Sequence, residues 1–208
     1  MSSRFVPGLI ALCALLVIAP PGLQSLALSQ PGREALHVQA LFGLCALAAL
    51  VALVISPFVI PVPRLRTFAL GSLAASAAVL LSLYLGSNLG SRVRMAAFQR
   101  LAERSASLVQ AVRSYEVQHG TPPPDLAALV PKFLPAIPGT GLAAYPSYEY
   151  LAGEKAARFD GNPWVLVVST PSGGINFDTF MYFPLQNYPE TGYGGSLERV
   201  LDWAYVHE

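Results

Sequence analysis

The sequence predicts an α-helical membrane anchor followed by an α+β domain in which one long helix packs on a small antiparallel sheet. Charge is the first reason, because only five of the first 86 residues are charged whereas the remaining 122 hold 20 of the 25 charges. The second is a helical repeat of apolar residues that begins near residue 92, and the third is a set of short alternating segments after residue 146. We therefore expect a membrane anchor over 1–86 and a water-exposed domain over 87–208.

Three apolar segments of the anchor are long enough to cross about 30 Å of hydrocarbon as helices. They cover residues 5–28, 35–60 and 68–86 approximately. The first is interrupted by Pro20 and Pro21 and also has the features of a signal peptide, so two outcomes stay open. It is either a retained first span or a leader whose cleavage leaves two spans. Small residues in the third segment would allow a neighbouring helix to approach closely.

The arginines flanking these segments predict the orientation of the chain, since positively charged loops stay in the cytoplasm. Arg64 and Arg66 lie in the short loop between the second and third segments. This places the loop inside and the domain 87–208 outside, which fits a protein of the bacterial inner membrane. Arg92, Arg94 and Arg100 follow the third segment and favour the opposite orientation.

The exported domain is expected to begin with a helix that runs from Arg92 to His119. Its apolar residues recur every three or four positions, so one face of the helix is predicted to pack on a sheet. Gly120 is suited to cap the end of this helix, and Asp125 is suited to begin a short helix over Leu126–Val130. Upstream, the Gly-Ser-Asn-Leu-Gly sequence at 86–90 favours a kink between the third span and this helix.

Four later segments, short and rich in aromatic and β-branched residues, are predicted to be strands: Ser147–Leu151, Trp164–Ser169, Asp178–Phe183 and Trp203–His207. The segment Gln186–Ser196 is rich in glycine and is predicted to be a surface loop. The third predicted strand carries aromatic residues on both faces. It is therefore either central and covered on both faces, or part of an exposed binding surface.

Three stretches of the domain are notable: Ala111-Val112-Arg113-Ser114-Tyr115, His119-Gly120-Thr121-Pro122 and the run from Leu126 to Pro138. Together they resemble the globular region of type II secretion pseudopilins. In that family a membrane-proximal helix ends at a similar Tyr, Gly and Pro sequence and is followed by a leucine-containing turn and a small sheet. The resemblance implies a pilin-like fold over about 95–185. The chain differs from pseudopilins because its domain follows three spans, and because it lacks their processing site and the glutamate of their first helix.

The sequence lacks the short motifs that mark common enzyme classes. It has no Gly-x-Ser-x-Gly elbow, no P-loop and no dinucleotide-binding fingerprint. Its histidines, His37, His119 and His207, have no second histidine or cysteine at the spacing of zinc ligands. Arginine and lysine are not clustered with aromatic residues, which excludes nucleic acid as a partner. We expect no catalytic residue, no metal and no cofactor.

An acidic and aromatic group is the best candidate for a binding site. We expect a ligand or partner surface made of Asp178, Tyr182, Tyr188 and Trp203. The favoured function is a non-enzymatic interaction or scaffold protein of the cell envelope, with the lipid bilayer and an envelope protein as partners. The alternative is a membrane-tethered domain that binds or hydrolyses glycans, since glycosidases use paired carboxylates. A transporter role ranks last, because the apolar segments contain no Asp, Glu, Lys or Arg.

Overall fold

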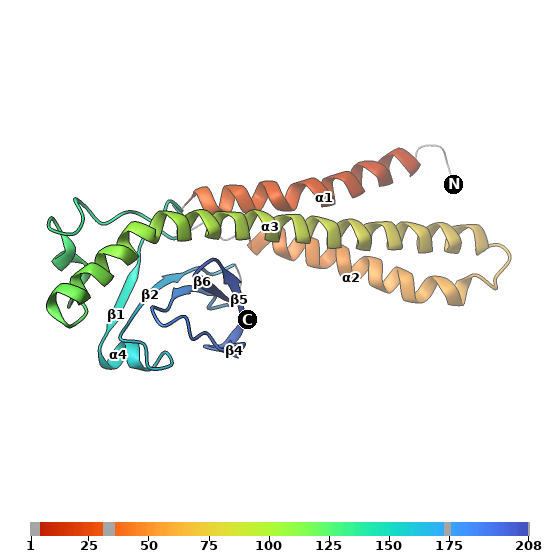
Figure 1. The fold of residues 1–208 in the computed structure, drawn as a ribbon. Helices are drawn as coiled ribbons and strands as arrows, with labels where there is room; N and C mark the ends of the chain where they lie inside the picture. Colours follow the sequence, from red (N-terminus) through yellow and green to blue (C-terminus); the bar gives the residue numbers. More distant parts are fainter. Residues whose placement is uncertain (1–4, 31–35, 173–175, 208) are drawn as a thin grey trace. The chain divides into compact units, whose positions relative to one another are not determined.

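The structure is a computed structural model that describes residues 5–30, 36–172 and 176–207 (Figure 1). Its backbone divides into two compact units. The first consists mainly of the apolar helices up to Arg94, and the second contains the chain from Met95 onward together with a short stretch that begins at Leu28.

Three long helices begin in the first unit: α1 (Phe5–Ser29), α2 (Leu36–Val59) and α3 (Arg66–His119). The part of α3 from Met95 onward belongs to the second unit. Each of the three helices contains a window that is long and apolar enough to cross a membrane, which confirms three candidate spans. Position 35, where the second span was expected to begin, lies outside the described residues. The α1 helix continues through Pro20 and Pro21, which stand inside it.

The α3 helix has 54 residues and continues through the glycines at 86 and 90, where a kink was predicted. Gly86 has a different role, because a Cβ atom placed on it would lie 2.1 Å from the carbonyl oxygen of Leu16 and 2.9 Å from Cγ of Pro20. Glycine is therefore what allows α1 to approach α3 so closely at this point.

The second unit contains a six-stranded sheet in which every neighbouring pair is antiparallel. The four predicted strands are all present, and the boundaries of two of them were predicted to the residue. The predicted loop Gln186–Ser196 is partly wrong, because it contains the short strand Thr191–Gly192 and the start of the strand Gly195–Val200. In sheet order the strands are β1 (Glu149–Ala152), β2 (Trp164–Ser169), β3 (Thr179–Tyr182), β6 (Trp203–His207), β5 (Gly195–Val200) and β4 (Thr191–Gly192).

One face of the sheet packs on α3, as the helical repeat predicted. The ring of Phe98 in α3 stacks on that of Phe180 in β3, with centroids 4.9 Å apart. The core between helix and sheet includes Leu101, Leu108 and Val112 from α3. This arrangement confirms the predicted helix-on-sheet α+β unit.

The opposite face of the sheet is also covered. Met181 and Phe183 lie in a second, smaller core to which the short helix α4 (Glu154–Ala157) contributes Ala156. Phe159, Tyr188 and Tyr193 pack against it from the surrounding loops. The β3 strand lies between β2 and β6 and is buried on both faces. Of the two alternatives predicted for this strand, the structure therefore has the central strand that is covered on both faces.

The helix ends follow the predicted caps. Gly120 has φ +74°, and its N–H donates to the carbonyl of Glu116 at 2.8 Å. The Asp125 side chain accepts a hydrogen bond of 3.0 Å from Ala128 N, so it caps the next element as expected. That element, η1 (Leu126–Leu129), is a 3₁₀ turn rather than an α-helix.

Candidate interaction surface

The residues predicted as a ligand or partner surface lie mostly in the interior. Asp178, Tyr182 and Trp203 are each only 2% exposed, and Tyr188 is half-buried. The alternation of β3 and β6 was correctly predicted, but the faces on which these side chains lie are covered. A face of exposed acidic and aromatic groups is therefore not formed by these residues.

Asp178 and Trp203 have interactions that fit a structural role. The indole of Trp203 stacks on Phe180 with centroids 5.0 Å apart and planes at 11°. Oδ2 of Asp178 accepts a hydrogen bond of 2.5 Å from the hydroxyl of Tyr205, which satisfies a buried carboxylate. Both side chains help to fix β3 against β6.

Tyr182 links the sheet to α3. Nη2 of Arg113 donates to the Tyr182 hydroxyl at 2.7 Å and to the carbonyl of Pro184 at 3.5 Å. Burial raises the pKa of Tyr182, and the nearby Arg113 partly opposes this shift. The arginine itself is exposed, so its charge remains at the surface.

Tyr188 is held by a precise set of hydrogen bonds. Its hydroxyl accepts from the backbone N–H of Phe183 at 2.7 Å and donates to the carbonyl of Asp202 at 2.7 Å. The ring stacks on Phe183 at 4.6 Å, and the guanidinium of Arg199 lies 4.0 Å from the ring centroid. Burial raises the pKa of Tyr188 above its ordinary value.

Further hydrogen bonds join the segment after β3 to the turn between β5 and β6. Gln186 donates from Nε2 to the carbonyls of Phe183 at 2.7 Å and Asp202 at 3.0 Å. Arg199 donates from Nη2 to Oε1 of Gln186 at 2.7 Å and to the carbonyl of Leu201 at 3.2 Å. The two loops are therefore fixed against each other.

Two leucines project from these fixed loops into solvent. Leu185 is 56% exposed and Leu201 is 55% exposed. Arg113 and Arg199, both exposed, lie beside the same loops through the hydrogen bonds given above. We call these four residues the leucine–arginine patch. Sequence reasoning missed it, because its members come from α3, β5 and two loops and share no local motif.

The acidic residue Asp160 serves the loops around the second core. Its carboxylate accepts a hydrogen bond from the hydroxyl of Tyr193, and its carbonyl accepts one of 2.7 Å from Nδ2 of Asn187. Among the described residues, no group of three or more His, Cys, Asp or Glu side chains is placed to hold a metal ion.

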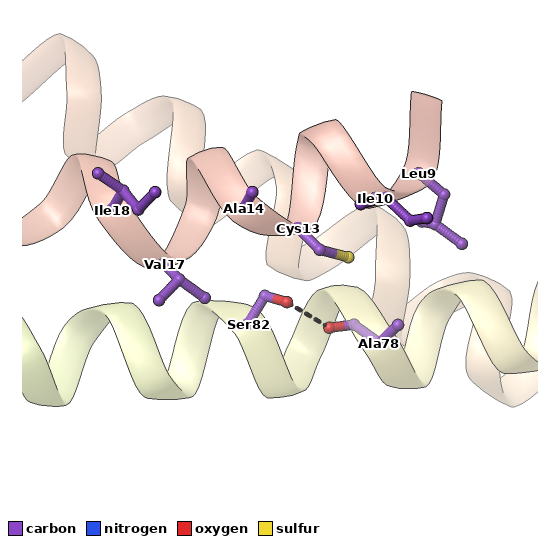
Figure 2. A pocket seen from close by; sticks show the side chains of 8 residues that line it. All are labelled: Leu9, Ile10, Cys13, Ala14, Val17, Ile18, Ala78 and Ser82. Atoms are coloured by element: carbon purple, nitrogen blue, oxygen red, sulfur yellow. Dashed lines mark hydrogen bonds between the residues drawn. The ribbon is translucent and has the colours of Figure 1, made fainter. Parts of the chain in front are cut away.

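The apolar unit has a shallow groove between α1 and α3 (Figure 2). Figure 2 shows Cys13 on α1 facing the segment of α3 that carries Ser82. The Ser82 hydroxyl donates to the carbonyl of Ala78 at 2.8 Å, so its polarity is satisfied within the helix. The other lining residues are apolar, which suits contact with hydrocarbon: Leu9, Ile10, Ala14, Val17 and Ile18.

Fold and site together define a class of protein. The chain has three helices able to span a membrane and an α+β unit with a six-stranded antiparallel sheet. A comparison with protein families, curated proteins and solved structures found no match in any of the three.

Proposed function

We propose that this protein is a membrane-anchored, non-enzymatic interaction or scaffold protein of the cell envelope. The observation that carries the proposal is the double role of α3. Its first part is apolar enough to span a membrane, and its later part supplies Phe98, Leu101 and Leu108 to the core of the α+β unit. One helix thus contributes both to a candidate span and to the core of the folded unit.

The packing of α3 on an antiparallel sheet supports the proposed pilin-like character of residues 87–208. The helix ends at Gly120, a turn with a buried Leu129 follows, and the sheet comes after both, which is the order expected of a pseudopilin-like domain. The anchor differs, since two further apolar helices precede α3. We therefore propose a fixed scaffold module rather than a subunit that assembles into a filament.

We place this module on the extracytoplasmic side of the bacterial inner membrane. Arg64 lies in the tight connection between α2 and α3, and Arg66 is the first residue of α3; both are exposed. Backbone hydrogen bonds join Val62 to Val59 and Leu65 to Val62 within this connection. A short, positively charged connection is a strong signal for cytoplasmic retention. With this loop inside, a span through α3 puts the α+β unit outside.

Two reporter fusions test the proposal. One is placed after Glu208, and a matched one is inserted at Arg64, in the connection between α2 and α3. We expect a reporter that works only outside the cytoplasm to be active at the first site and inactive at the second. The reverse pattern would overturn the proposed orientation. As a control, replacement of Arg64 and Arg66 by Ser should weaken the difference, because it removes the retention signal.

The glycan-binding or glycan-hydrolysing alternative needs acidic and aromatic groups on an open face. Asp178, Tyr182 and Trp203 are buried, and no observation among the described residues favours that alternative. We do not propose it.

A further inference from the structure

A face of α3 that does not pack on the sheet carries two exposed arginines, Arg92 and Arg100. The core residues Phe98, Leu101 and Val112 occupy another face of the same helix. At 3.6 residues per turn, the two arginines stand about two turns apart and roughly 80° from each other around the helix axis. Neither has a hydrogen bond or an ion pair with another of the residues that the structure describes. Both guanidinium groups can therefore bind a ligand from outside the chain.

Positive charge is concentrated in the part of the chain that follows the third apolar segment. Residues 87–113 contain five arginines and one acidic residue, Glu103, so their net charge is +4. The carboxylate of Glu103 accepts a hydrogen bond of 3.1 Å from Gln99. Residues 114–208 contain four basic and ten acidic residues, so their net charge is −6. An anionic surface would attract the first stretch and repel the second, which is the charge complementarity expected beside a membrane that contains anionic lipids.

Tyr84 and Arg92 indicate where the hydrocarbon ends along α3. Tyr84 is 66% exposed near the end of the apolar segment 68–86, and exposed tyrosines are typical of the boundary between membrane and water. About 12 Å of helix separates it from Arg92, at 1.5 Å per residue. Because side chains of a helix point toward its N-terminus, the Arg92 side chain extends back toward the span. Its guanidinium can thereby reach the phosphates of the lipid headgroups.

We propose that Arg92 and Arg100 form a binding site for the phosphate groups of anionic phospholipids. Guanidinium groups donate paired hydrogen bonds to phosphate oxygens, so they suit this ligand better than other cationic groups do. The nearby Arg104 is not part of the site, because its guanidinium lies against Gly141, where an added Cβ would be 2.8 Å from Cζ. The inference rests on the membrane anchoring in the proposed function, but it does not depend on the side of the membrane on which the α+β unit lies.

The test measures which lipid gathers beside Arg92 in the full chain, reconstituted into phosphatidylcholine vesicles. Leu89 is 39% exposed on α3, so a cysteine introduced there can carry a fluorophore once Cys13 and Cys45 are replaced by Ser. Spin-labelled phosphatidylglycerol, which is anionic, or spin-labelled phosphatidylcholine then quenches the fluorophore. We expect phosphatidylglycerol to be favoured at this position at least about fivefold. Equal quenching by the two lipids would overturn the proposal.

Arginine variants assign the lipid preference to these residues. Arg92→Gln should reduce it at least about threefold, and the double variant with Arg100→Gln should abolish it. Arg158→Gln is the matched control, because Arg158 is also exposed but lies at the end of α4, and it should leave the preference unchanged. The melting temperature should stay the same in all of these variants, since exposed arginines without a partner contribute little to stability. An equal effect of Arg158→Gln and Arg92→Gln would refute the site, because net charge alone would then explain the preference.

Salt and the reporter fusions separate the remaining outcomes. In salt of about 1 M the screening length falls to about 3 Å, so the preference for phosphatidylglycerol should decrease at least about twofold. A preference that this salt leaves unchanged would overturn the proposal. A reporter after Glu208 that works only in the cytoplasm would overturn the proposed orientation and leave the lipid site in place. Equal quenching by the two lipids together with an exported reporter would overturn the lipid site alone.

Discussion

Replacing Tyr188 by phenylalanine tests how the loop after β3 is held. The ring would keep its stacking on Phe183 and its contact with Arg199, because phenylalanine has the same ring. Only the hydroxyl is removed, and with it the 2.7 Å bonds to the N–H of Phe183 and to the carbonyl of Asp202. The substitution therefore isolates the energy of these hydrogen bonds.

The expected loss follows from the burial of the groups left behind. Phe183 is fully buried, so its N–H would lose its partner in the interior. An unsatisfied buried donor costs about 1–3 kcal/mol. For a unit of this size, each kcal/mol shifts the melting temperature by roughly 4 °C, so we expect Tyr188→Phe to melt about 4–12 °C lower.

The same variant should change the alkaline limit of stability. Burial raises the pKa of Tyr188 above its ordinary value of 10.0, so above pH 10 the unfolded chain loses this proton while the folded unit keeps it. The stability that the neutral tyrosine contributes is full below pH 10 and falls as the pH rises. For one tyrosine, the unfolding free energy falls by at most about 1.4 kcal/mol per pH unit. Tyr188→Phe removes the part of this pH dependence that comes from Tyr188.

Tryptophan fluorescence of the full chain in detergent is the appropriate measurement. Both tryptophans, Trp164 and Trp203, lie in the sheet, so the signal reports the α+β unit alone. Tyr193→Phe is the matched control, because the Tyr193 hydroxyl bonds the carboxylate of Asp160 near solvent and its loss should cost less than about 1 kcal/mol. A change below about 0.5 kcal/mol in Tyr188→Phe would show that the hydroxyl does not satisfy Phe183.

Two further predictions concern the caps and the anchor. Asp125→Ala removes the bond to Ala128 N and should lower the unfolding free energy by about 1 kcal/mol in the same fluorescence assay; no change would exclude the cap. Gly86→Leu should separate α1 from α3. On oxidation, a disulfide between Cys13 and a cysteine introduced at Ser82 should then form in lower yield than it does with Gly86 in place. Gly43→Leu is its control, since a Cβ there has no atom within 4 Å, and equal crosslinking in both variants would contradict the contact at Gly86.

The sequence predicted the buried strands well because their patterns are unambiguous. Trp164–Ser169 and Trp203–His207 are short apolar runs with aromatic and β-branched residues, bounded by turn residues, and β2 and β6 have those bounds. The helical repeat likewise predicted which face of α3 meets the sheet. In each case the local pattern and the tertiary packing favour the same structure.

The β5 strand was missed because its residues do not favour a strand. Gly195–Val200 reads Gly-Ser-Leu-Glu-Arg-Val, in which only the leucine and valine are apolar and the glycine is unfavourable. The strand forms because it pairs with β6, whose residues are mostly buried, and through the pairing of Leu197 with Val206 it contributes to the second core. That stabilisation comes from a partner strand and is not visible in the segment itself.

The burial of Asp178, Tyr182 and Trp203 was not predicted, for a related reason. Alternation shows that Phe180 and Tyr182 share a face, but it does not show what covers that face. The cover is α3, about 70 residues earlier, where Arg113 reaches the Tyr182 hydroxyl. The exposed leucines of the leucine–arginine patch gave no signal, because a single exposed apolar residue in a loop is common.

Gly86 is unfavourable for the stability of its own helix but favourable for the packing of two helices. Within its own helix, glycine lowers stability, and this favours a kink. Against α1, the same lack of a side chain allows the carbonyl of Leu16 to lie where a Cβ would be. Since Leu16 is itself buried, this contact gives α1 a structural role in the anchor. The close packing stabilises the pair of helices, and it explains why a glycine is tolerated in the middle of a long helix.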